Sequence, residues 1–118
     1  MFSEGLYGLD YQAATDMPDV IGSGLAMLRA GKIIGTDRCG SVFIGACEYD
    51  RHHRVSRVSV RMQVPPDGEL VTGVPTGAEG ATFDITVTIK AALVVETTVE
   101  VAGRPVNVKL TYIGPLPH

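Results

Sequence analysis

Between Phe83 and Lys90 the chain reads FDITVTIK, a strict alternation of apolar and polar side chains. Successive side chains of a β-strand point to opposite faces, so this alternation predicts a strand with one buried face and one solvated face. The same period of two returns from Leu93 to Val101 and again from Val106 to Tyr112. The sequence therefore predicts three consecutive antiparallel strands, joined as a meander, with a turn at residues 102–105.

Upstream of this stretch the chain divides into further short segments. Alternation from Val58 to Val64 predicts another strand, which the Pro-Pro-Asp-Gly sequence at residues 65–68 ends. Segments 5–11, 22–29, 32–36 and 41–48 predict four more strands, with a hairpin turn at Ala30 and Gly31. Segment 41–48 is apolar at nearly every position, so we expect it to be covered on both faces. Residues 13–19 and 72–80 are the expected linkers, the second a surface loop.

Seven or eight short strands without a long helical period indicate an all-β fold. The predicted architecture is an antiparallel up-and-down β-barrel of the calycin or lipocalin kind, because closure removes unpaired strand edges. A two-sheet β-sandwich is the alternative. The chain has 118 residues, which suits one domain covering residues 1–118.

Composition argues against several classes of partner. There are 13 acidic and 10 basic residues, so the net charge is −3, whereas proteins that bind nucleic acid usually carry a basic surplus. Apolar runs are far shorter than the roughly 20 residues of a membrane-spanning helix, and the N-terminus lacks the pattern of a signal peptide. We therefore expect a cytoplasmic protein with no nucleic-acid or membrane partner, in which Cys39 and Cys47 are free thiols. A disulfide between neighbouring strands is the alternative.

Candidate catalytic and metal-binding residues are few. Ser23 lies between two glycines, but the strand-to-helix context of a nucleophilic serine or a phosphate loop is missing. His52 and His53 are adjacent and would point to opposite faces of a strand, which makes them a poor chelate. The sequence thus predicts no catalytic residues, no metal and no cofactor. The surrounding basic residues, including Arg57 and Arg61, are interpreted as a solvated outer face.

The order of several short motifs resembles the GrlR-like family, the negative regulators of type III secretion. The matching segments are Gly5-Leu6-Tyr7, Gly22-x-Gly24, residues 31–37 (GKIIGTD), Val42-Phe43-x-Gly45 and Val58-x-Val60. The resemblance covers about the first 65 residues and continues only as a strand pattern. It implies a calycin-like barrel, often dimeric, that binds a partner protein. In the best-known branch that partner is a transcriptional activator, recognised by a loop of four alternating acidic residues.

The corresponding turn in this chain comprises Glu48, Tyr49, Asp50 and Arg51. Only two of these four residues are acidic, and the basic residues after them reverse the local charge. The predicted function is a non-enzymatic regulator or adaptor that binds a partner protein through these four residues, and the resemblance implies a homodimer. The alternative is an intracellular carrier of a small apolar ligand, because an eight-stranded barrel is either filled by its own side chains or holds one small molecule.

Overall fold

The computed structural model describes residues 2–13, 21–38, 40–65, 80–92, 94–101 and 104–116. Within these residues the fold is all-β, with no helix, and the strands follow one another along the chain. Their bounds are β1 Gly5–Ala13, β2 Ile21–Arg29, β3 Lys32–Asp37, β4 Val42–Asp50, β5 Val55–Val64, β6 Ala81–Ile89, β7 Val94–Val101 and β8 Arg104–Gly114. These eight strands confirm the fold class expected from the alternating sequence pattern.

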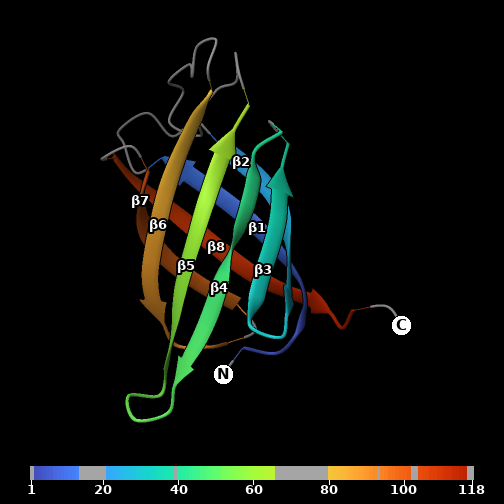
Figure 1. The fold of residues 1–118 in the computed structure, drawn as a ribbon, viewed down its shortest axis with the longest axis vertical. Coiled ribbons are helices and arrows are strands. Elements are labelled where there is room, and N and C mark those ends of the chain that lie inside the picture. Colours follow the sequence, from blue (N-terminus) through green and yellow to red (C-terminus); the bar gives the residue numbers. More distant parts are fainter. Residues whose placement is uncertain are drawn as a thin grey trace.

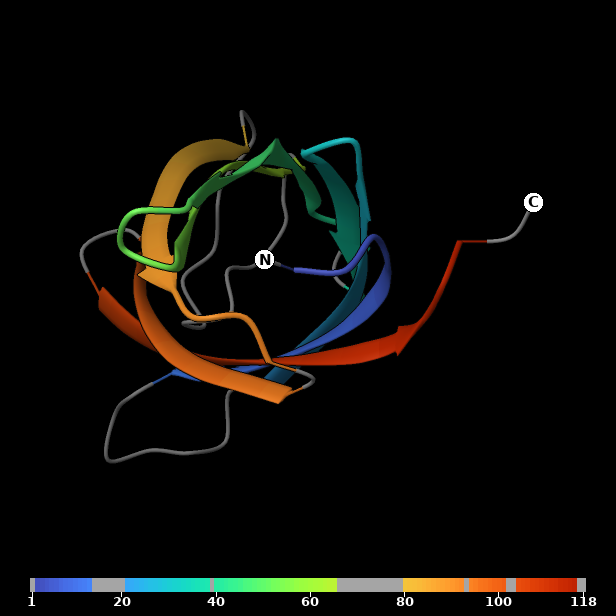
Figure 2. The ribbon, with the colours of Figure 1, turned by 90° about the horizontal axis from the view of Figure 1, so that it is seen from below.

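The strands form one sheet that curls into a nearly closed barrel. Its order is β6-β5-β4-β3-β2-β1-β8-β7, and every hydrogen-bonded pair is antiparallel. Figure 2 looks along the barrel and shows the strands arranged as a ring around a central space. The barrel prediction is thus confirmed over the sandwich alternative. Among the described residues, the neighbours β6 and β7 are joined by no ladder, which leaves one open seam.

This seam corrects part of the predicted meander. β7 pairs with β8 from Val94 opposite Thr111 to Val101 opposite Arg104, as expected, whereas β6 pairs with β5 alone. The connection between β6 and β7 lacks the two-residue Asn-Gly type of turn that holds two strands in register. β6 is paired with β5 and β7 is paired with β8 along their other edges. The two strands separate along the barrel wall and do not pair with each other (Figure 1).

Two further expectations are wrong, one about where a strand begins and one about the burial of a strand on both faces. The turn predicted at residues 102–105 includes Arg104 and Pro105, but these begin β8. Residues 102 and 103 lie outside the described residues, as do residues 14–19 and 72–79 of the two predicted linkers. Segment 41–48 is covered on one face only, and Ile44 on the other face is 50% exposed. A barrel wall one sheet thick buries only its inner side, so an apolar run does not by itself imply two covered faces.

The predicted hairpin at residues 30 and 31 is confirmed. Ala30 and Gly31 have φ angles of 51° and 75°, as the two central residues of a type I′ turn require. Arg29 pairs directly with Lys32 across this turn.

Apolar side chains fill both ends of the barrel interior in two clusters. One cluster comprises the buried residues Tyr11, Phe43, Met62, Val64, Val101 and Val106. The second comprises Phe2, Tyr7, Leu28, Ile89 and Val95. The Phe2 and Tyr7 rings meet edge to face with centroids 6.0 Å apart, and the N-terminus lies over the middle of the ring in Figure 2.

Candidate functional site

A cavity of about 170 Å³ lies inside the barrel, between residues of the two clusters. Its wall is apolar and draws on all eight strands, with Leu9, Leu28, Ile33, Phe43, Val60, Ile85, Val99 and Leu110 among the lining residues. No charged side chain lines it among the described residues. The sequence did not decide whether side chains fill the barrel interior, and the structure shows that the interior is partly hollow.

Small residues at inward positions explain why space remains inside. Gly24 and Ala26 on β2, Gly35 on β3 and Gly45 on β4 all share the inner face with larger apolar residues, as the strand registers show. A β-carbon built on Gly45 would lie 2.1 Å from the backbone oxygen of Ser59. That approach is possible only for glycine, and such close contacts accompany sharp curling of a sheet. The glycines thus allow neighbouring strands to approach closely, and Ala26 contributes only a methyl group to the cavity wall.

Four lining residues carry polar side-chain groups, Tyr7, Tyr11, Cys47 and Thr97, but the surface that the cavity exposes is apolar. Tyr7 donates its hydroxyl proton to the backbone carbonyl of Ser3, and burial, with Tyr112 and Cys47 nearby, raises the pKa of Tyr7. Burial also raises the pKa of the Cys47 thiol, a free and half-buried group, so this thiol is protonated and weakly nucleophilic at neutral pH. The cavity therefore presents an apolar surface with no fixed charge.

The predicted partner-binding residues lie at the far end of the β4–β5 hairpin, which extends beyond the neighbouring strands (Figure 1). Glu48 is exposed, Tyr49 and Asp50 are partly buried, and Arg51 begins the exposed turn at residues 51–54. The structure thus brings the four residues together at one tip, and it gives Asp50 a role that the sequence pattern did not reveal.

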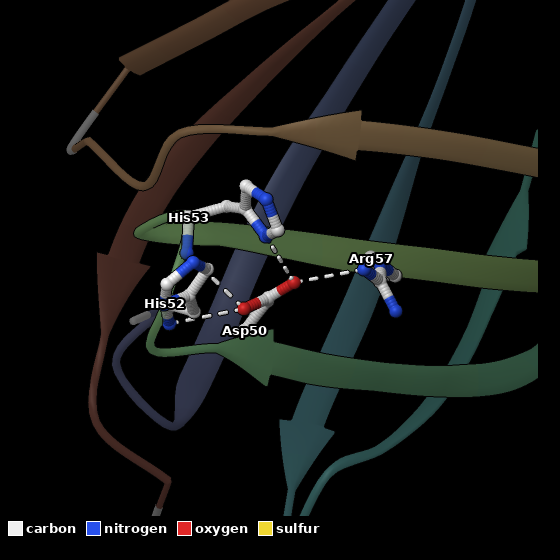
Figure 3. A network of polar contacts seen from close by, with 4 residues as sticks. All are labelled: Asp50, His52, His53 and Arg57. Atoms are coloured by element: carbon white, nitrogen blue, oxygen red, sulfur yellow. Dashed lines mark hydrogen bonds and ion pairs between the residues drawn. The ribbon is translucent and has the colours of Figure 1, made fainter.

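Asp50 organises this turn, as Figure 3 shows. Its Oδ1 accepts backbone N–H bonds from His52 and His53 at 3.0 and 3.1 Å. Its Oδ2 lies 2.8 Å from His53 Nδ1 and accepts a 2.8 Å bond from the Arg57 guanidinium. The His53 side chain, its backbone N–H and the nearby Arg57 charge lower the pKa of Asp50. An Asp that accepts backbone bonds from the second and third residues after it is a common turn signal, which the local sequence could have indicated.

The basic stripe on β5 is exposed, as the alternation predicted, but its charge is largely neutralised. Arg57 is paired with Asp50, and Arg61 Nε lies 3.0 Å from Asp84 Oδ1 on β6. Asp84 is therefore an ion-pair partner on the outer face, while Ser59 between the two arginines is exposed. The stripe is a solvated face held by cross-strand pairs, which are worth little individually when exposed.

Other candidate groups do not assemble into a site. Ser23 lies on β2, where its carbonyl accepts a 3.1 Å bond from the Arg38 N–H, and Cys39 lies outside the described residues. Among the described residues, no three His, Cys, Asp or Glu side chains gather as a metal ion would require. In the same part of the chain, no helix has the length and apolar character to cross a membrane.

Comparison with known proteins finds no matching family model, no matching curated protein and no matching solved structure. The resemblance to GrlR-like proteins is therefore untested, and the function must be argued from the chain's own geometry.

Proposed function

We propose that this protein is a non-enzymatic binding protein that holds one small, neutral, apolar molecule inside its barrel. The observation that carries this proposal is the apolar cavity of about 170 Å³. An engineered apolar cavity of about 150 Å³ in another protein stays dry and binds benzene or xenon, which sets the scale of an occupant. A benzene- to indole-sized ligand suits this interior, whereas a long acyl chain does not.

The absence of charge from the described cavity wall narrows the ligand class further. An ionised carboxylate or ammonium group entering this space would lose its hydration without gaining a partner, which costs several kcal/mol or more. A neutral ligand loses no such solvation, and the apolar surface of the cavity matches it. The proposed class is therefore small hydrocarbons, aromatics and heteroaromatics, and not fatty acids.

Alkylation of Cys47 tests this proposal, because the thiol lines the cavity. The purified protein is treated with iodoacetamide at mildly alkaline pH, with and without indole, and peptide mass spectrometry follows Cys47 separately from Cys39. Bound indole should slow alkylation of Cys47 in a saturable manner and leave the rate of a free thiol peptide unchanged. An equal concentration of charged indole-3-acetate should protect far less. Alkylation of Cys47 that is unaffected by indole, benzene and naphthalene alike would contradict the proposal.

A second candidate function is docking of a partner protein at the β4–β5 tip, as the regulator hypothesis states. The observation that favours it is the exposure of Glu48 and of the turn at residues 51–54 at the end of a protruding hairpin. Asp50 is engaged within the turn, so Glu48 and Arg51 are the residues through which a partner would be recognised. The proposed compartment is the cytoplasm, since Cys47 is a free thiol and free thiols persist in reducing compartments.

Glu48→Lys tests the second candidate without disturbing the turn. Pull-down from cells that produce the protein should recover a partner with the native chain and lose it with this variant, while Thr88→Lys, an outward change on β6, should retain it. A partner recovered equally with Glu48→Lys would refute the tip as its site. Changing Asp50 is unsuitable here, because it would remove the contacts that order the hairpin.

A further inference from the structure

The outer surface of β2, β3 and β4 carries three large exposed apolar side chains on adjacent strands, whereas the other two, Val94 and Ile113, lie on β7 and β8. Outward positions of β5, β6 and β7 carry polar residues such as Arg57, Thr86 and Glu96. On β2–β4, however, Leu25, Ile34 and Ile44 point outward and are 53%, 50% and 50% exposed. An antiparallel sheet with one solvated face normally places polar residues there, so this group needs a separate explanation.

Strand register makes these residues one continuous patch. Ile34 pairs directly with Met27 on one side and with Ile44 on the other, and side chains of directly opposed residues lie roughly 5 Å apart. Leu25 directly opposes Thr36, the next outward residue of β3 after Ile34. We call Leu25, Ile34 and Ile44 the outer apolar patch.

Three exposed basic residues lie beside this patch. Arg29 and Lys32 lie at the β2–β3 turn end and Arg38 lies just after the other end of β3, and all three are exposed. None of the three forms an ion pair within the described residues. Two of the nearby acids are engaged locally: Glu4 accepts the backbone N–H of Ala30 at 2.7 Å, and Asp37 accepts that of Ser41 at 2.9 Å. Two further exposed acids on this face directly oppose other basic residues, Asp10 opposing Lys109 and Glu48 opposing Arg57.

We propose that the outer apolar patch, with its rim of Arg29, Lys32 and Arg38, docks an acidic segment of a partner protein that carries aliphatic or aromatic anchors. The charges favour this occupant over a second copy of the chain. A symmetric dimer contact applies the same surface of both subunits, which would bring two sets of unpaired cations to one interface. An acidic partner instead gains from all three cations, which steer association and set its orientation.

A lipid surface fits the patch less well. Faces that bind membranes usually carry Trp, Tyr or Phe at the level of the headgroups, and the patch contains only aliphatic side chains. This docking surface lies on the outer side of the barrel wall, opposite the cavity, and is separate from the β4–β5 tip.

Site-specific photocrosslinking tests the inference. Ile34 is replaced by p-benzoylphenylalanine in full-length protein within the cells that produce it, and Thr86, an outward residue of β6, is replaced in a matched control. Crosslinked peptides are then identified by mass spectrometry. We expect adducts at position 34, and not at position 86, on a partner segment in which acidic residues outnumber basic ones.

Charge reversal supplies the second readout. The captured segment, made as a synthetic peptide, should bind the native chain and should lose roughly tenfold in affinity with Arg29→Glu combined with Lys32→Glu, a change of about 1.4 kcal/mol. Thermal unfolding of the variant checks that it is folded, and Leu25→Thr should weaken the peptide without altering any charge. Adducts with a second copy of the chain, adducts with lipid, a basic or uncharged captured segment, or no adduct at all would each overturn the inference.

Discussion

A larger side chain at a position that lines the cavity tests directly whether the interior is hollow. Ala26 on β2 points inward, lies opposite Tyr7 on one side and Gly35 on the other, and lines the cavity. Ala26→Leu adds three carbon atoms at that position. If they enter existing space, the variant should be more stable than the native chain and should no longer bind small apolar molecules.

The expected gain follows from the added apolar surface. Three carbon atoms removed from water at about 0.8 kcal/mol each contribute about 2.4 kcal/mol. Ordering a leucine side chain costs about 0.5–1 kcal/mol, so the net gain in the free energy of unfolding is about 1.5 kcal/mol. For a domain of this length the unfolding entropy is about 0.25 kcal/mol per kelvin, so the melting temperature should rise by about 6 °C.

Two assays on the same protein separate cavity filling from a general change in stability. Guanidinium unfolding measures the free energy, and protection of Cys47 by indole measures occupancy. Ala46→Leu is the matched control, because Ala46 is an exposed outward residue of β4 and should leave indole protection unchanged. A loss of 1–3 kcal/mol in Ala26→Leu, the usual cost of overpacking a filled core, would refute the reasoning, as would a stable variant that still protects Cys47.

Three further predictions concern the turn, the seam and a buried hydroxyl. Because the pKa of Asp50 is lowered, its stabilising contacts should be complete above about pH 3.9, the ordinary Asp value, and should be lost only as the pH falls through the lower pKa of the folded state. NMR titration of the His53 and Arg57 signals measures this loss, and Asp50→Asn should remove the transition and loosen the turn at every pH. Amide hydrogen exchange should be faster in β6 and β7 than in β4 and β5, because each seam strand is paired along one edge only; equal protection would show that the seam is closed in solution. The Ser41 hydroxyl is fully buried and has no hydrogen-bond partner among the described residues, so Ser41→Ala should raise the free energy of unfolding by about 1 kcal/mol, and a loss of similar size would indicate a partner that the structure does not contain.

The fold could be predicted because period-two alternation is a local signal. From Phe83 to Ile89 the polarity of each side chain indicates whether it lies on the inner or the outer face, and the structure places all seven as the pattern indicates. Which edges pair is not a local property, which is why the predicted β6–β7 pairing was wrong. The outward exposure of Ile44 was missed for the same reason: an apolar residue in an apolar run does not reveal whether a second layer covers it.

The candidate sites differ in how much of each could be predicted from the sequence. Of the predicted turn from Glu48 to Arg51, only Arg51 lies in the turn at residues 51–54, because β4 continues through Asp50. That Asp50 is committed to the turn requires the distances to His53 and Arg57. The regulator role and the homodimer stay predictions, since no observed partner or relative bears on them.

The cavity was undecidable from the sequence because its volume depends on register as well as on composition. Ala26, Gly35 and Phe43 follow one another across β2, β3 and β4 on the inner face, and only this alignment sets two of the smallest side chains side by side. A one-residue slip would turn every inward side chain of a strand to the outer face, so the hollow interior and the outer apolar patch depend on the same register. A change that shifts β3, whose strand carries both Gly35 and Ile34, should therefore abolish ligand binding and partner docking together.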